Sequence, residues 1–138
     1  MKLLELFVYG PEAQSGGVAN LVVTLFAARD IGHKLHLLTS SFAQHIALEE
    51  FYTGIVDLAD EMAEVCQGRH GALLTDMLNC QPDVKFTCDP ITFARELDRY
   101  LQTLGRSRVG SDSTLQNILD EIIALASRMK YKLENLVN

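Results

Sequence analysis

The chain has 138 residues, 48% of them hydrophobic, which suits a single globular domain over residues 1–138 with a core of its own. Its net charge of −6 argues against direct nucleic-acid binding, because that binding depends on lysine and arginine contacts to phosphates. No apolar run is long enough to span a membrane, and the N-terminus lacks the basic start and cleavage site of a signal peptide, so we expect a cytoplasmic protein without membrane contact.

Residues 1–15 form an apolar N-terminal arm in our interpretation. The pattern leaves open whether this arm is a strand, a helical turn or an extended segment, and whether it packs on its own chain or on a neighbouring subunit. From Ser15 or Gly16 to about residue 38, apolar residues occupy most sides. This pattern predicts a helix that is buried on more than one side.

A single long helix is predicted from Ser41 to Gly68. Ser41 followed by Gln44 has the form of a capping box, and Gly68 is a suitable helix end. Apolar residues recur at spacings of three and four and form one face: Leu48, Phe51, Ile55, Ala59, Met62 and Cys66. About 27 residues at 1.5 Å each give a helix of roughly 40 Å, a normal length in a four-helix bundle.

Two histidines stand near the end of the first helix, His36 and, one turn earlier, His33. A lone histidine on an apolar face is more often a hydrogen-bonded core residue than a ligand. The second histidine and the acidic helix that follows favour the interpretation that His36 is a metal ligand.

Only residues 39–41 break the helical pattern, which indicates an antiparallel helix pair. We therefore expect His36 and His45, which flank this corner, to lie close together.

The second helix carries a stripe of potential ligands beside its apolar face. Relative to His45, Glu49 lies at about 40°, Asp60 at about 60° and Glu64 at about 100° around the helix axis. Charge runs on helices usually face water, so a solvated acidic face is the plain alternative to a binding site.

The chain becomes irregular after Gly68. Residues 70–78 predict a short helix, and residues 82–89 predict an extended segment between prolines. We expect this stretch to be the crossover connection that a helix bundle needs.

Two further helices complete the prediction. Asp89 and Pro90 mark a helix start that leads to an end at Gly105, and residues 106–112 predict a polar loop. Ser113 with Gln116 repeats the capping signature before a last helix that runs nearly to the C-terminus. The predicted fold is all-α, a four-helix bundle with a long crossover between helices 2 and 3.

The run from His33 to Gly68 resembles the second-helix region of the ferritin-like Dps proteins, the DNA-binding proteins from starved cells. Their signature is a histidine, a second histidine about a dozen residues later, an acid four residues on, and then Asp-x-x-Ala-Glu. The counterparts here are His33 or His36, then His45, Glu49, Asp60 and Glu64. The whole chain, with the segments 116–122 and 131–133, is also similar to a family of small uncharacterised ferritin-like proteins encoded mainly by bacteriophages.

The Dps resemblance implies a ferritin-like bundle and a metal site shared between subunits. In that family two histidines of one subunit and two acids of a twofold-related subunit hold iron, which is oxidised and then stored in a hollow shell. Carried over to this chain, the ligands are His36, His45, Glu49, Asp60 and Glu64, with His33 as the alternative first ligand. The resemblance implies iron, or another divalent transition metal, and a homo-oligomer, either a dimer or a larger shell. For a phage-encoded protein the location would be the host cytoplasm.

Three hypotheses follow. The first is a Dps-like metal-binding protein with ferroxidase and iron-storage activity. The chain also departs from Dps proteins, because Leu37-Leu38 replaces their Trp-Asn pair and no basic N-terminal tail is present. The second hypothesis is therefore a non-catalytic phage accessory protein that binds a host or virion component. The third is a structural subunit that uses the bundle for oligomerisation. No nucleophile has a recognisable catalytic context, so no catalytic residue is assigned.

Overall fold

The computed structural model describes residues 10–136, with side chains from Gly17 onward. The predicted arm lies in part outside these residues. The part that is described, from Gly10, already belongs to a helix, α2 (Gly10–Leu38), the first helix of the described residues. This helix therefore begins earlier than the predicted start at Ser15 or Gly16.

The described chain is helical and contains no strand, so the prediction of an all-α protein is confirmed. The described residues form four helical segments, one after another. The third segment consists of three elements that follow one another without a break. The four segments are α2, α3 (Phe42–His70), α4 (Pro90–Tyr100) with η2 (Leu101–Gly105) and α5 (Arg106–Val109), and α6 (Ser113–Asn135). None of the helices in this part of the chain combines the length and the apolar character needed to cross a membrane.

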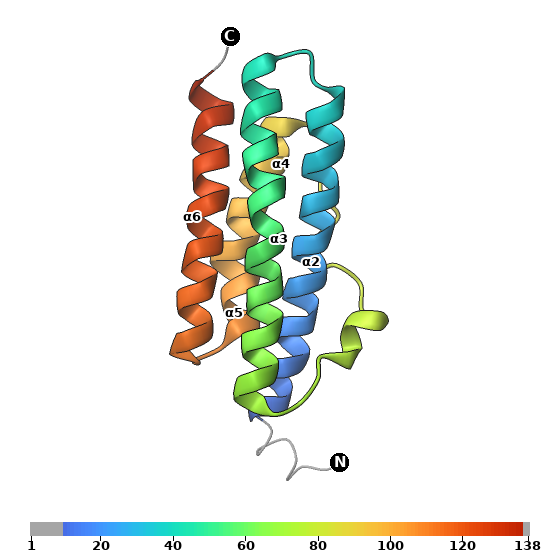
Figure 1. The fold of residues 1–138 in the computed structure, drawn as a ribbon, viewed down its shortest axis with the longest axis vertical. Helices are drawn as coiled ribbons and strands as arrows, with labels where there is room; N and C mark the ends of the chain where they lie inside the picture. Colours follow the sequence, from blue (N-terminus) through green and yellow to red (C-terminus); the bar gives the residue numbers. More distant parts are fainter. Residues whose placement is uncertain (1–9, 137–138) are drawn as a thin grey trace.

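The long helices lie side by side (Figure 1). The chain turns sharply between α2 and α3, so these two helices run in opposite directions. The segment 71–89, which includes the short 3₁₀ helix η1 (Thr75–Leu78), then returns along α2 to the end of the molecule where α4 begins. As a result, α3 and α4 run in the same direction, and α6 runs back against both.

The predicted apolar face of α3 forms part of the core. All six of its predicted residues are buried. Phe51 makes an edge-to-face contact with Phe93 of α4, with ring centroids 5.9 Å apart. Two glycines let neighbouring helices approach closely: a Cβ atom at Gly32 would lie 3.1 Å from the Phe51 ring, and one at Gly54 would lie 3.2 Å from Leu125. These contacts hold α3 against α2 and α6.

Two predicted helix ends are wrong. α3 continues past Gly68 and ends at His70, where Gly71 adopts the left-handed conformation with φ 68°. Likewise, the third segment continues past Gly105 to Val109, and Gly110 with φ 71° ends it, so the predicted loop is mostly helical. A glycine within a helix costs only about 1 kcal/mol, and it stops the helix only where the chain also requires a positive φ.

The last helix also begins differently from the prediction. Asp112, not Ser113, is its N-cap, and the Asp112 carboxylate accepts hydrogen bonds from the backbone N–H groups of Thr114 and Leu115. The same carboxylate accepts a bond of 2.7 Å from Arg69 Nε. Burial alone would raise the pKa of Asp112, but the bonds from Arg69 and the two N–H groups outweigh burial and lower this pKa. Aspartate satisfies two free donors at once here, which explains its place at the cap.

A buried carboxylate fixes the segment 71–89 to the helices. Asp83, whose side chain is 6% exposed, accepts hydrogen bonds from Tyr100 Oη at 2.7 Å and from Arg108 Nη2 at 2.7 Å. Its backbone N–H donates to Thr24 Oγ1 of α2 at 2.8 Å. Burial would raise the pKa of Asp83, yet the hydrogen bonds from Arg108 and Tyr100 more than compensate and lower it. Asp83, Tyr100, Arg108 and Thr24 form what we call the Asp83 latch.

Candidate metal centre

The corner between α2 and α3 is organised by short polar side chains. Ser41 Oγ accepts a hydrogen bond from the Gln44 N–H at 3.2 Å, as the capping signature predicts. Thr39 Oγ1 donates to Gln44 Oε1 at 2.6 Å and accepts from the Ser41 N–H at 3.0 Å. These bonds close the corner within three residues, and they bring the last turn of α2 against the first turn of α3.

His36 and His45 meet across this corner, as expected from the sequence. Their rings are stacked, with centroids 3.7 Å apart and planes inclined by 19°. Each ring also binds the backbone of the other residue: His36 Nδ1 lies 2.7 Å from the His45 carbonyl oxygen, and His45 Nδ1 lies 2.9 Å from the His36 carbonyl oxygen.

These reciprocal hydrogen bonds determine which ring nitrogens are available. A carbonyl oxygen only accepts hydrogen bonds, so each Nδ1 must carry a proton and donate it. In the neutral rings, therefore, each Nε2 keeps its lone pair. Histidines that bind metals usually donate their other N–H to a carbonyl or carboxylate in this way, which fixes the ring orientation before the metal arrives.

Glu49 completes a cluster with the two histidines. One nitrogen from each ring and one carboxylate oxygen of Glu49 lie within 4.8 Å of one another. His36 is buried, His45 is half-buried and Glu49 is exposed, so the cluster is anchored inside and reaches solvent through the carboxylate. Two imidazoles and one carboxylate with free coordination positions form the donor set of non-haem Fe(II) sites, and they suit other divalent transition metals as well.

The structure distinguishes between the two predicted choices for the first histidine. His33 stacks on Tyr52 with ring centroids 4.2 Å apart, and its ring lies 6.2 Å from that of His36. Only His36 joins the cluster with His45 and Glu49. Tyr52 also makes an edge contact with His36 at 5.2 Å. Tyr52 was not predicted as a site residue from the sequence, although it lies seven residues after His45 and so on the same face of α3.

Asp60 and Glu64 are not part of this cluster. Both are exposed on α3, and at 1.5 Å per residue they lie about 22 and 28 Å beyond His45 along the helix axis. One chain therefore supplies three of the five predicted ligands at one place. The other two could reach such a cluster only from a second copy of the chain.

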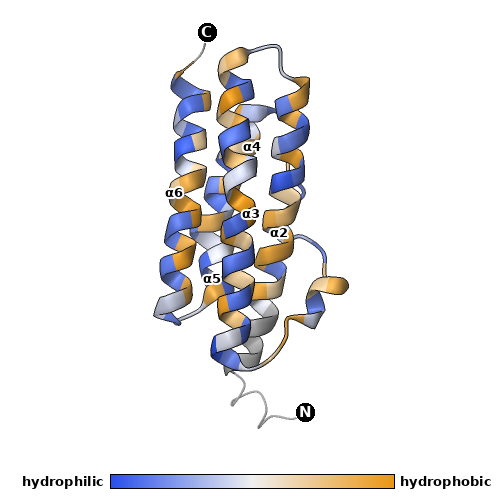
Figure 2. Cartoon of the chain, viewed as in Figure 1, coloured by the Kyte–Doolittle hydropathy of each residue, from blue (hydrophilic) through white to orange (hydrophobic). Residues whose placement is uncertain are grey.

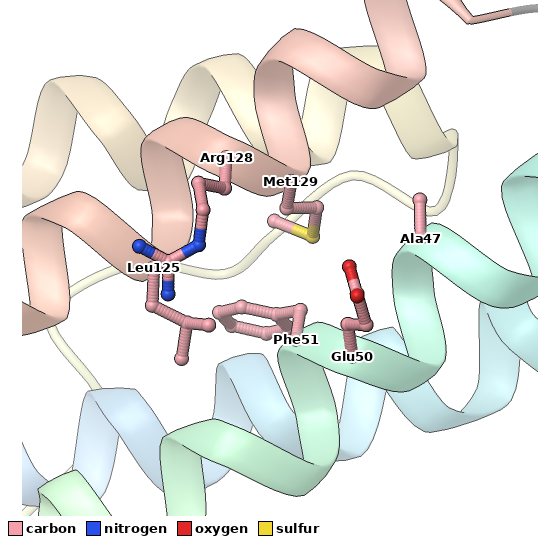
Figure 3. Close-up of a pocket in the computed structure, with 6 residues that line it drawn as sticks. All are labelled: Ala47, Glu50, Phe51, Leu125, Arg128 and Met129. Carbon is pink, nitrogen blue, oxygen red and sulfur yellow. The ribbon is translucent and has the colours of Figure 1, made fainter.

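A small cavity elsewhere on α3 does not offer a comparable ligand set. It has a volume of about 190 Å³, lies between α3 and α6, and is drawn in Figure 3. Its lining consists of Ala47, Glu50, Phe51, Leu125, Arg128 and Met129. The one carboxylate, that of Glu50, is paired with Lys132 of α6, and no imidazole or thiol lines the cavity. We therefore assign the candidate metal centre to the α2–α3 corner.

Comparison with curated proteins and with solved structures gives no match. One family model does match, over residues 36–133, which is more than half of the chain and includes His36, His45, Glu49, Asp60 and Glu64. The chain therefore belongs to the family of unknown function DUF5856.

Proposed function

We propose that this protein is a Dps-like metal-binding protein that takes up Fe(II), or another divalent transition metal, at His36, His45 and Glu49. One observation carries the proposal: each Nδ1 donates to a backbone carbonyl, so each Nε2 keeps its lone pair, and one nitrogen of each ring lies within 4.8 Å of a Glu49 carboxylate oxygen. Because the ligands are already arranged, little ordering is needed when the metal binds.

The proposal includes a ferritin-like four-helix bundle as the fold. The course of the chain supports this fold, since α3 and α4 run in the same direction and are joined by the long segment 71–89 along α2. A bundle with one such crossover is the arrangement of ferritin-like proteins, in which metal ligands project from facing helices.

Iron oxidation and storage would require a second copy of the chain. Two α3 helices packed in opposite directions about a twofold axis near Thr53 would place His45 of one chain level with the turn that carries Asp60 and Glu64 of the other. The partner would then supply two carboxylates to a site that already has three ligands. Such a site would hold iron in contact with oxidant, and the oxidised iron would collect within a larger assembly.

Exposed apolar side chains beside the site support self-association. Leu37 is 67% exposed, Leu38 79% and Phe42 70%, and all three lie at the α2–α3 corner. Figure 2 shows hydrophobic residues gathered at this end of the two helices. Contiguous apolar patches on soluble proteins commonly mark interfaces.

Metal titration of the purified protein tests the proposal. We expect calorimetry under anaerobic conditions to show saturable Fe(II) or Co(II) binding, with affinity reduced at least tenfold in His45→Ala and in His36→Ala. His33→Ala and His70→Ala are matched controls and should retain the wild-type affinity. Affinity should also fall as the pH is lowered, because imidazole binds metals only in its neutral form. Wild-type protein that binds neither ion would contradict the proposal.

A second function is favoured by the same histidine pair. The reciprocal hydrogen bonds already satisfy both rings through the backbone, and they tie α2 to α3 without any metal. The corner could therefore be a purely structural device in a non-catalytic phage accessory or assembly protein that uses its apolar corner to bind other subunits. In that case His36→Ala would lower the melting temperature, and added metal would change neither the melting temperature nor the oligomeric state of the wild type.

A further inference from the structure

A larger cavity lies on the other side of α2, where the segment 71–89 passes over it. Its volume is about 460 Å³, within the range of small-molecule sites. Helix α2 contributes Ala27, Asp30, Ile31 and Lys34, which share one helical stripe. The crossing segment contributes the remaining lining residues, Gln81, Pro82, Val84, Lys85, Phe86 and Cys88.

The apolar floor of this cavity is fixed by the core. Phe86 is only 6% exposed and makes an edge-to-face contact with Phe93, with ring centroids 5.3 Å apart. Ile31 and Val84 are partly buried and pack against the same core. A ligand chain would therefore meet an apolar surface that does not need to rearrange.

The outer wall is also held in place. Asp83 lies between the lining residues Pro82 and Val84, and the Asp83 latch ties it to Thr24 on α2 and to Tyr100 and Arg108. The opening between α2 and the crossing segment is therefore set by these partly buried hydrogen bonds, which makes the cavity a preformed one.

The mouth of the cavity carries unpaired positive charge. Lys34 and Lys85 are both exposed lining residues, and neither forms an ion pair with any residue that the structure describes. The acidic lining residue, Asp30, is already paired with Arg29 at 3.1 Å. Two free ammonium groups thus stand at the rim of an apolar cavity, in a chain whose net charge is −6.

We propose that this cavity binds an amphipathic anion, a small molecule with one short alkyl or acyl chain and a carboxylate or phosphate head. The chain would lie on Ile31, Val84 and Phe86, and the head would be held by Lys34 and Lys85. Burial of the apolar chain favours binding, and the two ammonium groups select the charge of the head. The proposal uses none of the residues of the candidate metal centre.

Binding of ligands that share an eight-carbon chain but differ in their head group tests this proposal on the full-length protein. Octanoate and octyl phosphate represent the two anionic heads, and octylammonium is the cationic control. We expect calorimetry to show saturable one-to-one binding of at least one anion and none of the cation, and the tighter anion identifies the preferred head. Saturable binding of octylammonium with the same affinity, or no binding of either anion, would overturn the proposal.

Variants and a chemical probe then locate the site. Lys34→Ala with Lys85→Ala should weaken anion binding about tenfold, whereas Lys130→Ala with Lys132→Ala, a double change on α6, should leave it unchanged. Alkylation of the exposed Cys88 by iodoacetamide, followed by mass spectrometry, should slow as the anion saturates, while Cys80, which does not line the cavity, serves as an internal control. Unchanged Cys88 alkylation at saturation, or full affinity in the Lys34/Lys85 variant, would place the ligand elsewhere and refute the assignment.

Discussion

Hydrogen bonds from single side chains fix the two least regular parts of this structure, the α2–α3 corner and the segment 71–89. At the corner, each of two imidazoles binds the carbonyl of the other residue. In the crossing segment, the buried carboxylate of Asp83 accepts hydrogen bonds from Tyr100 and Arg108, which lie on separate turns of the third helical segment. The backbone N–H of Asp83 donates to Thr24 of α2. In both places a few hydrogen bonds hold the chain together, as apolar packing does along the helices. Each bond satisfies a backbone or charged group that is shielded from water.

The Asp83 latch leads to a stability prediction. Asp83→Asn removes the charge that Arg108 and Tyr100 bind, and we expect it to lower the free energy of unfolding by about 2 kcal/mol at pH 7, as measured by urea denaturation. The Asp120→Asn change removes an exposed ion pair with Arg106 and should cost less than about 0.5 kcal/mol. Equal losses of unfolding free energy in the two variants would contradict the view that burial strengthens the Asp83 interactions.

The same residue predicts a pH dependence. The folded-state pKa of Asp83 is lowered from its ordinary value of 3.8, so its contribution to stability is complete above that value and is lost as the pH falls through the folded-state pKa. Protonated Asp83 resembles asparagine. The difference in unfolding free energy between wild type and Asp83→Asn should therefore shrink as denaturation is repeated from pH 7 toward pH 3, and a constant difference would show that the charge is not responsible.

At the scale of elements, the third helical segment contains an irregularity that keeps its faces in register. Its π-helical turn, Leu101–Gly105, accommodates one extra residue. Buried residues here recur every four positions, at Leu97, Leu101, Gly105 and Val109, a spacing that would drift around a regular α-helix by about 40° per step. The wider turn absorbs about 100° of this drift. It also brings Arg108 to the side of Tyr100, so that both reach Asp83.

This interpretation predicts an unusual tolerance to deletion. Removing the exposed Gln102 should convert the π turn into a regular α turn and leave the faces on either side in place, so we expect the unfolding free energy to change by less than about 1 kcal/mol. Removing the exposed Ser127 from regular α6 rotates everything after it by about 100° and should cost several kcal/mol. Circular dichroism and urea denaturation compare the two deletions, and equal damage would show that the wide turn does not act as an insertion.

The sequence allowed the helices to be predicted better than their ends. Apolar spacing located the buried face of α3, because burial imposes that spacing directly. Residue type alone does not reveal whether Gly68 or Gly71 takes a positive φ, since both tolerate the helical conformation. At the candidate site, the approach of His36 to His45 followed from the short corner. The pairing of each Nδ1 with a carbonyl depends on ring positions that no spacing rule specifies, and the roles of Asp60 and Glu64 remain predictions.

For the molecule as a whole, the proposed function requires a second copy, and the apolar corner provides a direct way to test for one. Light scattering of purified protein at micromolar concentration should show a dimer or a larger assembly. Leu38→Asp and Phe42→Asp each place a charge within the exposed apolar corner, and we expect either change to reduce the assembly to monomers. Leu78→Asp is the matched control, because Leu78 is 85% exposed but lies on η1, away from the corner.

The monomeric variants also separate the local site from the shared one. His36, His45 and Glu49 come from one chain, so a Leu38→Asp monomer should still bind one metal ion, but more weakly than the assembled wild type, because it lacks the partner's carboxylates. The double change Asp60→Asn with Glu64→Gln should weaken the metal affinity of the assembled protein as much as dissociation into Leu38→Asp monomers does. The size of the assembly should stay unchanged. If this double change had no effect on affinity in the assembly, the metal would belong to the corner of each chain alone, and the twofold arrangement proposed for α3 would be wrong.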